Sequence, residues 1–524
     1  MSRATSRRTP APQAAPVVPA VSDFAAPPLP NAAAPANWFT GSEPALNRPK
    51  FIPKEALGRA QRATGDKTFY VPLRPSQSRI VSQDTLKNTT IARLRVSCLG
   101  TLDLTRRDDL AYGFERFPAR VCGMISIFEM CWIGTTHAPG NSATTQIVAR
   151  AWPEQDVVFH ADASHIAELQ RDASLTTLPN VRFSPVPVSS AWPGRPAVVS
   201  AARAWQEFST VLRALRAAPR HEPQLVFLIS TTATGSAAAA WASRLSGRQV
   251  AVQVGLHGNL SDAFGWRSRN PVSRAADLHA ALVGRHPVPL RFLVLEEGIK
   301  AALEQRLPAA ARRTDALPLP INPAELCDAP AALPSSPIRF GFVGLGTADK
   351  GIDIFLRLAS AMRTRHGDRA EFVHVGRVPG GANLAGYAVL RDPPATAHLS
   401  RDEFTRRLGG LHHVVLPFGR GYYDLSASGA LMDAITWLRP VITTRVPLTE
   451  RLFEEFGDVG VLCDDEAALA VAVEEAIIRP DPERYLRQVE ALRRARTARH
   501  PAELAQRYRH LVECGFPDLF KPAA

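Results

Sequence analysis

A lysine, a histidine and two carboxylates stand where loops would follow apolar runs of this chain. Lys350 comes shortly after Ile338–Val343, His257 comes shortly after an apolar run that ends at Val254, and Asp424 and Asp433 follow another apolar run. An ammonium group and the N–H groups at a helix start bind phosphate. An imidazole can orient a hydroxyl or exchange a proton with it near neutral pH. Carboxylates accept hydrogen bonds from hydroxyls. Together these groups suit a phosphate-bearing ligand with free hydroxyls.

The elements that position these residues follow one repeated order between Arg339 and Thr444: a buried strand, a short loop and an amphipathic helix. Ile338–Val343 is the first strand, and Phe355, Leu358 and Met362 keep helical spacing after it. Strands that alternate with helices predict a parallel sheet. Ligands bind such sheets at the carboxyl ends of the strands, where the loops lie.

A second α/β unit precedes this one. Gln224–Ser230 and Gln249–Val254 predict two strands joined by a Gly/Thr loop and an Ala-rich helix, and Arg291–Leu295 predicts a further strand with a helix from Glu296. The proline-rich stretch from Leu317 marks a linker. We therefore expect an α/β protein with two Rossmann-like domains. Its four parts are a disordered Ala/Pro-rich tail (1–62), the first Rossmann-like domain (63–325), the second Rossmann-like domain (326–480) and a basic helical segment (481–524).

Length and composition agree with this division. The chain of 524 residues is too long for one core. A formal net charge of +13 favours anionic partners, although a basic surface without a specific partner explains it equally well. Six scattered cysteines without a C-x-x-C pair indicate free thiols in a reducing compartment. No apolar run approaches the roughly 18 residues of a membrane span, and no secretory signal is visible.

These features predict a cytoplasmic protein. The arginine-rich helix predicted over Pro482–His510 is either a solvated charged face or a basic patch at the inner face of a membrane, so a peripheral membrane contact stays open. The positive charge is spread out and accompanies no aromatic-basic module, which excludes a typical nucleic-acid binder.

Residues 338–470 resemble the second domain of GT-B glycosyltransferases, in particular the family-4-type group (glycosyl transferases group 1). The order and spacing of short motifs over about a hundred residues carry this resemblance, at positions Gly344, Lys350-Gly351, Gly376, Pro417, Asp433-Ala434 and Pro440-Val441-Ile442. In the first domain, Val252–Gly258 resembles the strand-His-Gly element on the acceptor side of the family.

The resemblance implies a GT-B fold with two Rossmann-like domains facing a cleft. It implies transfer of a hexosyl group, with retention of configuration, from a nucleotide-diphosphate sugar to a hydroxyl of a glycan or lipid-linked saccharide, as in polysaccharide biosynthesis. No cofactor and no metal are expected. The implied donor-binding residues are Gly344, Gly346, Lys350, Ser428, Gly429, Ala430, Leu431 and Asp433. The implied catalytic residues are His257 and Asp424, and the acceptor-side residues are Asn259, Trp266 and Arg267.

The chain departs from the family pattern at two positions. Leu345 replaces the arginine of the family, and Asp424 stands nine residues before Asp433 instead of eight. A non-catalytic GT-B protein that binds a sugar nucleotide or acts as a scaffold is therefore an alternative. A less favoured one is an NAD-dependent oxidoreductase, suggested by the glycines of Gly341–Gly346, but no acidic residue ends the next strand to hold a ribose.

Simpler interpretations exist for each candidate. Lys350 could be a surface lysine, His257 a structural histidine, and Asp433 a favourable charge in a first helical turn. His160, Asp162 and His165 have a spacing that suggests a metal, but no fourth ligand is evident, and we interpret them as loop residues at a strand end.

Overall fold

Two parallel β-sheets organise the chain. The computed structural model describes residues 68–70, 80–82, 123–188, 196–219, 222–258, 260–265, 267, 276–327, 333 and 336–519. The expected tail (1–62) and a strand expected over Ile91–Leu99 lie outside these ranges. The first described elements are a short antiparallel pair, β1 (Thr68–Tyr70) and β2 (Ile80–Ser82).

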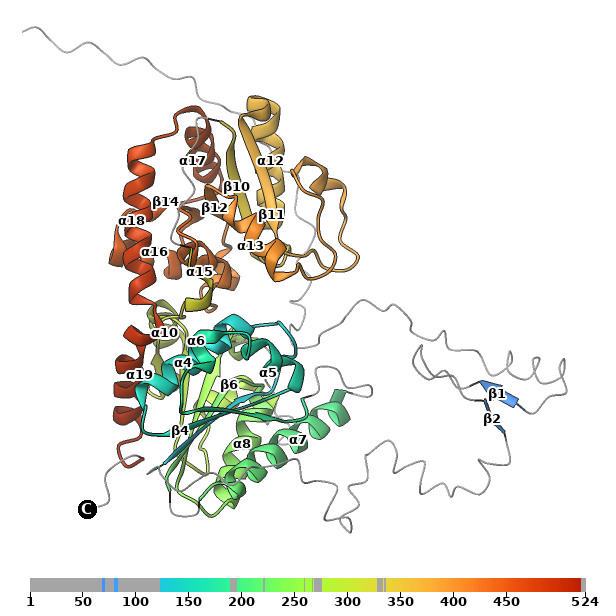
Figure 1. Cartoon of the computed structure of the whole chain (residues 1–524), viewed down its shortest axis with the longest axis vertical. Helices are drawn as coiled ribbons and strands as arrows, with labels where there is room; N and C mark the ends of the chain where they lie inside the picture. Colours follow the sequence, from blue (N-terminus) through green and yellow to red (C-terminus); the bar gives the residue numbers. More distant parts are fainter. Residues whose placement is uncertain are drawn as a thin grey trace, which may run out of the picture. The chain divides into compact units, whose positions relative to one another are not determined.

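The first sheet has seven parallel strands in the order β5-β4-β3-β6-β7-β8-β9. Figure 1 labels β4 and β6 of this sheet. The strands are β3 (Met124–Glu129), β4 (Asp156–Ala161), β5 (Val181–Pro185), β6 (Gln224–Ser230), β7 (Val250–Leu256), β8 (Leu290–Val294) and β9 (Thr314–Ala316). The predicted unit of strand, Gly/Thr loop, helix and strand is confirmed as β6, α8 (Ala233–Leu245) and β7.

Helices cover both faces of this sheet because successive side chains of a strand point to opposite faces. In β6, Val226 and Leu228 join one apolar core, while Leu225 and Phe227 join the other. Helices α7 (Pro196–Ala217), α8, α9 (Leu278–Val283), α10 (Glu297–Arg306) and α11 (Pro308–Ala311) bury side chains in the first core. Helices α4 (Ala138–Ala151), α5 (Ala163–Leu169) and α6 (Ala173–Thr176) bury side chains in the second. The short 3-10 helices of this half are η1 (Leu260–Phe264) and η3 (Pro323–Glu325).

The second sheet has five parallel strands in the order β11-β10-β12-β13-β14. They are β10 (Ile338–Val343), β11 (Ala370–Val375), β12 (His413–Leu416), β13 (Val441–Thr444) and β14 (Gly460–Cys463). Helices α13 (Arg401–Gly409), α15 (Gly429–Thr436), α16 (Pro447–Phe456) and α18 (Pro482–Ala498) bury side chains in one core, and α12 (Ile352–His366) and α17 (Glu466–Ile478) in the other. Shorter helices are η4 (Ala348–Lys350), η5 (Gly367–Arg369), η6 (Ala385–Val389) and α14 (Arg420–Tyr423).

The chain passes between the two halves twice, and a buried ion pair joins the two passages. Arg499, just after α18, donates from Nη2 to both carboxylate oxygens of Glu296 at 3.2 and 3.1 Å. Glu296 Oε1 also accepts from the backbone N–H of Leu319, and the N–H of Ile321 donates to the carbonyl of Arg499. The residues before α10, in the first linker and after α18 are therefore fixed to one another.

The arginine-rich end forms two helices, not one. His500 accepts from the N–H of Ala502 and Pro501 opens α19 (Pro501–Gly515), so the chain turns between Ala498 and Pro501. The second helix packs against α4, and its Tyr508 hydroxyl donates to Gln253 Oε1 of β7 at 2.5 Å. Helix α19 is thus part of the layer that covers the first sheet.

Candidate functional site

Glycines shape the loop that presents Lys350 at the carboxyl end of β10. Gly344 has a left-handed backbone (φ 103°), and its N–H donates to the carbonyl of Val375 at 2.8 Å. Gly351 is also left-handed (φ 83°), and a Cβ there would lie 2.3 Å from the carbonyl oxygen of Pro417. Only glycine fits this position without displacing backbone. Lys350 therefore ends η4, and Gly351 separates it from the start of α12, so it lies at a loop entering a helix as the sequence predicts.

The first sheet contributes His257 to the same region. His257 follows β7 directly and is half-buried. The next residue, Gly258, is left-handed (φ 65°), and a Cβ there would lie 3.9 Å from the hydroxyl oxygen of Tyr422. Helix α14 of the second half, which carries Tyr422, therefore lies beside the end of β7.

A second histidine, which the sequence analysis missed, lies next to His257. The ring of His137 is 6.0 Å from that of His257, centroid to centroid, and stacks on Trp132 at 4.8 Å. His137 precedes α4 with φ 61°, a left-handed conformation that is uncommon for a residue with a Cβ. Such backbone strain often occurs at functional sites. The sequence offered one signal, a histidine between a buried strand and the Ala138-Pro139 helix start.

His137 lies within electrostatic reach of both Lys350 and His257. The pKa of His137 is lowered to about 4 by desolvation, then by the charge of Lys350, then by that of His165. Part of its side chain is nevertheless exposed. Burial, then His137, lowers the pKa of His257 to about 3, and burial lowers the pKa of Lys350. None of the groups that shift these three pKa values is a carboxylate. The arrangement would therefore favour an anionic ligand, with both imidazoles neutral at pH 7.

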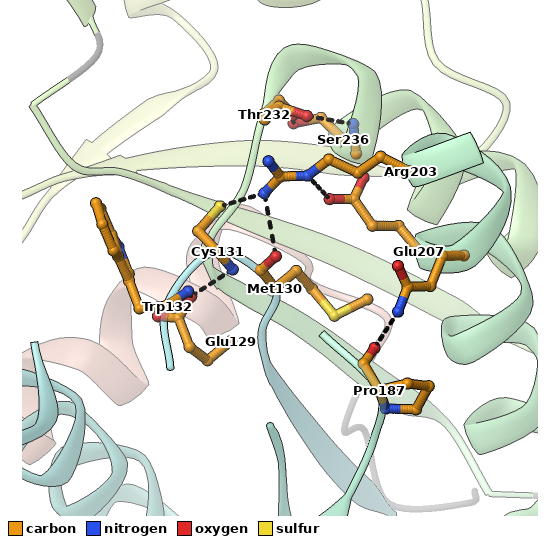
Figure 2. Close-up of polar contacts among 11 residues, drawn as sticks. Glu129, Met130, Cys131, Trp132, Pro187, Arg203, Glu207, Thr232 and Ser236 are labelled. Carbon is orange, nitrogen blue, oxygen red and sulfur yellow. Dashed lines mark hydrogen bonds and ion pairs between the residues drawn. The ribbon is translucent and has the colours of Figure 1, made fainter. Parts of the chain in front are cut away.

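A buried carboxyl group fixes the loop that carries Trp132. Glu129 Oε1 accepts from the backbone N–H groups of Cys131 at 2.8 Å and Trp132 at 3.1 Å, contacts that Figure 2 shows. Glu129 Oε2 accepts from Asn141 Nδ2, which also contacts His165 Nε2 at 2.9 Å. Burial raises the pKa of Glu129 to about 7 in spite of these hydrogen bonds. This network holds the turn between β3 and α4, on which His137 depends.

Arg203 of α7 supports the same turn from the other side (Figure 2). Its Nη2 donates to the carbonyl of Met130 at 3.1 Å and contacts Cys131 Sγ at 3.1 Å, while its Nε donates to Glu207 Oε1 at 3.1 Å. Burial raises the pKa of Glu207 to about 7. A Cβ at Gly235 would lie 2.4 Å from Glu207 Oε2, so α8 approaches α7 closely at this glycine. A small pocket beside this pair is lined by Met130, Pro187, Val188, Arg203, Gln206 and Glu207.

In the second sheet, Ser428 opens α15 as the sequence predicts. Its Oγ accepts from the N–H of Leu431 at 3.2 Å, and Gly429, Ala430 and Leu431 form the first turn. Asp433 lies beyond that turn, so the interpretation as a first-turn helix charge is wrong. Burial, then nearby Glu325, raises the pKa of Asp433 to about 7, while Arg401 opposes this shift.

The other carboxylate, Asp424, forms an ion pair across the two halves of the chain. Its Oδ2 lies 2.6 Å from Arg306 Nη2, at the end of α10. The next residue, Leu425, is buried in the core that α7, α8 and α10 share with the first sheet. Asp424 thus lies where the second-sheet loop meets the first sheet. Its predicted role at the sugar stays a prediction.

The remaining residues predicted from the sequence lie in different segments of the chain. Gly344 and Gly346 lie in the β10 loop, and the N–H of Gly346 donates to the carbonyl of Arg377 at 3.0 Å. Asn259 and Trp266 lie outside the described residues. Arg267 is exposed, and its charge contributes, after burial, to lowering the pKa of His279.

The three residues with a metal-like spacing have structural contacts. His160 stacks on Phe128 at 4.5 Å, Asp162 caps α5 through the N–H of Ser164, and His165 Nδ1 lies 2.7 Å from the carbonyl of Gly134. In the part of the chain that the structure describes, no group of three or more His, Cys, Asp or Glu side chains is arranged to hold a metal ion.

Comparison with known proteins depends on structure alone. No family model matches the chain, and no curated protein matches it in sequence. The structure is similar to that of WaaG, a glycosyltransferase involved in lipopolysaccharide biosynthesis, with a TM-score of 0.50 at 12% identity over 74% of this chain and 99% of the other. The chain has a GT-B fold.

Other solved structures also match at low identity. The N-terminal domain of Candida albicans trehalose-6-phosphate phosphatase matches with a TM-score of 0.49 and 8% identity, over 77% of this chain and 99% of that one. A glycosyltransferase from Rickettsia africae matches with a TM-score of 0.48 and 11% identity, over 76% and 99%. The match to WaaG confirms the expected GT-B fold, and a fold alone does not identify the substrate.

Among the described residues, none of the helices combines the length and the hydropathy that a bilayer span requires.

Proposed function

We propose that this protein is a glycosyltransferase that moves a sugar from a nucleotide-diphosphate donor to a hydroxyl of a glycan or lipid-linked saccharide. The observation that carries the proposal is the position of His137, whose ring lies 6.0 Å from that of His257 and whose pKa the charge of Lys350, from the second sheet, helps to lower. No carboxylate is among the groups that shift the pKa values of these three side chains. A site of this kind suits a phosphate group that becomes more negative as the reaction proceeds.

In the proposed reaction, residues of the second half bind the donor and His257 of the first half binds the acceptor. The acceptor oxygen forms a bond to the anomeric carbon while the bond from that carbon to the phosphate oxygen breaks, and the leaving diphosphate takes the electron pair. Lys350 and the N–H groups at the start of α12 stabilise this charge. A neutral His257 orients the acceptor hydroxyl, whose proton passes to the leaving diphosphate. Gly429–Leu431 and Asp433, beside the capped start of α15, bind the rest of the nucleotide.

The finer points belong to the same proposal. A hexosyl donor, retention of configuration, activity without a metal ion and a place in polysaccharide biosynthesis follow from the family resemblance. A cytoplasmic location follows from the composition of the chain. An NMR spectrum of the glycosylated product would give its anomeric configuration. Activity that survives dialysis against a chelator would support the metal-free mechanism, whereas activity that returns only with added magnesium would contradict it.

The test is a donor panel. Purified protein is incubated with uridine-, guanosine-, adenosine- and thymidine-diphosphate sugars, with and without simple saccharide acceptors, and release of the nucleoside diphosphate is followed. Release with one donor, increased by an acceptor, supports the proposal. Failure to bind or turn over any donor would contradict it.

One observation favours a second candidate, a non-catalytic GT-B protein that binds a sugar nucleotide. The carboxylate of Asp424 is engaged by Arg306, at 2.6 Å. Binding of a nucleotide sugar by calorimetry, without turnover across the acceptors, would support this alternative.

A further inference from the structure

The outer surface of α7 and α8 exposes large apolar side chains. Trp205 of α7 is 62% exposed, and Trp241 and Leu245 of α8 are 55% and 58% exposed. Trp205 also stacks on Phe208 at 5.5 Å, which holds its ring on the helix. Exposed apolar side chains that form one patch mark sites of interaction with a protein or a membrane.

These side chains belong to one surface because α7 and α8 lie side by side on the same face of the first sheet (Figure 1). Helix α7 buries Val211, Ala214 and Leu215 in this core and α8 buries alanines in it, so the opposite sides of both helices point away from the core. Arg248, after α8, donates to the carbonyls of Arg216 and Pro219 and so ties the C-terminal ends of the helices together.

The charges on this surface have one sign. Glu207 is the acidic residue within α7 and α8, and it is buried and bonded to Arg203. The exposed charged side chains Arg213, Arg216 and Arg244 form no ion pair with any carboxylate among the described residues. We call the surface formed by Trp205, Arg213, Arg216, Trp241, Arg244 and Leu245 the α7–α8 face.

The arginine-rich helices at the end of the chain differ from this surface because acidic residues neutralise them. Arg484 lies 3.2 Å from Asp458, and Arg509 lies 2.8 Å from Glu513. Arg507 pairs with Glu297, and Arg499 with Glu296. The positive charge of α18 and α19 is therefore largely balanced within the protein, whereas that of the α7–α8 face is open.

We propose that the α7–α8 face binds the surface of a bilayer that contains acidic phospholipids. Tryptophan side chains favour the interface between headgroups and acyl chains, and arginines near it are attracted to anionic headgroups. Trp205, Trp241 and Leu245 enter this interface, while Arg213, Arg216 and Arg244 contact phosphates. Uniform positive charge around the apolar side chains argues against a second copy of this chain as the partner, since two such faces would repel each other.

The inference is independent of the proposed reaction, since no residue of the α7–α8 face is assigned a role in that reaction. The test uses the full chain and two kinds of vesicle, one of phosphatidylcholine alone and one with about a third phosphatidylglycerol, an acidic content chosen to give a negative surface. Sedimentation at a series of lipid concentrations gives the partition constant at low and at physiological salt.

Two double variants carry the test, each with a matched control. Trp241→Ser with Leu245→Ser removes apolar side chains from the face, and Val471→Ser with Leu486→Ser removes two that are equally exposed, at 56% and 61%, on α17 and α18. Arg213→Glu with Arg244→Glu reverses two charges of the face, and Arg312→Glu with Arg479→Glu reverses two exposed charges elsewhere.

We expect the wild-type chain to bind the acidic vesicles and to lose affinity with salt. Each arginine near an acidic surface contributes about fivefold to binding, so the charge reversal should weaken binding at least about twentyfold. The serine pair should weaken it several-fold, while both control variants keep wild-type binding. Equal losses in test and control variants would overturn the proposal. So would the absence of binding to acidic vesicles, or a dimer in light scattering that the serine pair dissociates.

Discussion

The imidazole rings of His137 and His257 lie 6.0 Å apart, although they follow different strands of the first sheet. Strands β3 and β7 flank β6, so the loops at their carboxyl ends emerge close together. The charge of Lys350, which follows β10, reaches His137 and helps to lower its pKa. The candidate site is thus built by the strand order of one sheet and a single loop of the other.

The first prediction concerns His257. We expect His257→Asn to lower kcat/KM for sugar transfer about a hundredfold, because a small misplacement of the acceptor hydroxyl, which His257 orients, can cost that much. His137→Asn should lower it less, since Asn adopts the left-handed conformation (φ 61°) of this position without much strain. Exposed His510→Asn serves as the control. Transfer rates of His257→Asn equal to those of His510→Asn would remove His257 from the chemistry.

The second prediction concerns Lys350 and the donor. Lys350→Met should weaken the binding of a nucleoside diphosphate by about tenfold to a hundredfold, the value of a hydrogen bond to a charged group. Lys300→Met is a matched control, because Lys300 lies on α10 and pairs loosely with Glu304 at 4.0 Å. Isothermal titration calorimetry gives both affinities. The idea fails if both variants bind the nucleotide like the wild type.

The third prediction separates two roles for Asp424. Its ion pair with Arg306 is partly exposed, so losing the pair should cost about 1 kcal/mol of unfolding free energy or less. If the pair serves to hold the second-sheet loop on α10, Asp424→Arg combined with Arg306→Asp should recover activity that each single variant loses. Steady-state kinetics of the three variants decide this. A swapped variant as inactive as Asp424→Arg alone would instead indicate direct contact with the sugar.

The fourth prediction is a pH dependence of stability. His413 is buried between Phe340 and Tyr485, and burial, then His412, lowers its pKa to about 3. The folded state therefore binds fewer protons than the unfolded state below pH 6.5, and stability falls as the pH drops from there. At pH 5 this histidine should cost about 2 kcal/mol relative to pH 7.5.

Denaturant titrations of His413→Phe at both pH values check this expectation. The loss of stability between pH 7.5 and pH 5 should be smaller in the variant than in the wild type by about that amount. His510→Phe provides a control at an exposed site. A variant with the same pH dependence as the wild type would show that His413 does not carry this sensitivity.

Local pattern was sufficient to predict the sheets. Strands buried on both faces are nearly continuous apolar runs, so Ile338–Val343 and Gln224–Ser230 were predicted with the bounds that β10 and β6 have. The start of α15 was predicted for a similar reason, since Ser428 caps it through a contact only three residues away.

The site needed information that lies beyond local pattern. His137 meets His257 only because β3 and β7 flank β6, and a sequence does not display strand order. Its left-handed backbone is equally hidden, because nothing in the residue type demands it. The partner of Asp424 is Arg306, on a helix that belongs to the other sheet, so helical spacing gave no indication of the pair.

The packing of α19 on α4 has a consequence for synthesis. A ribosome releases the strands of the first sheet well before the last helix, whose Leu504, Tyr508 and Val512 complete the core on one face. Until then that face stays uncovered, and exposed apolar surface on a nascent chain invites misfolding and aggregation. The first sheet should therefore reach its final stability only after translation ends, and a nascent chain stalled before Pro501 should be a preferred client of chaperones.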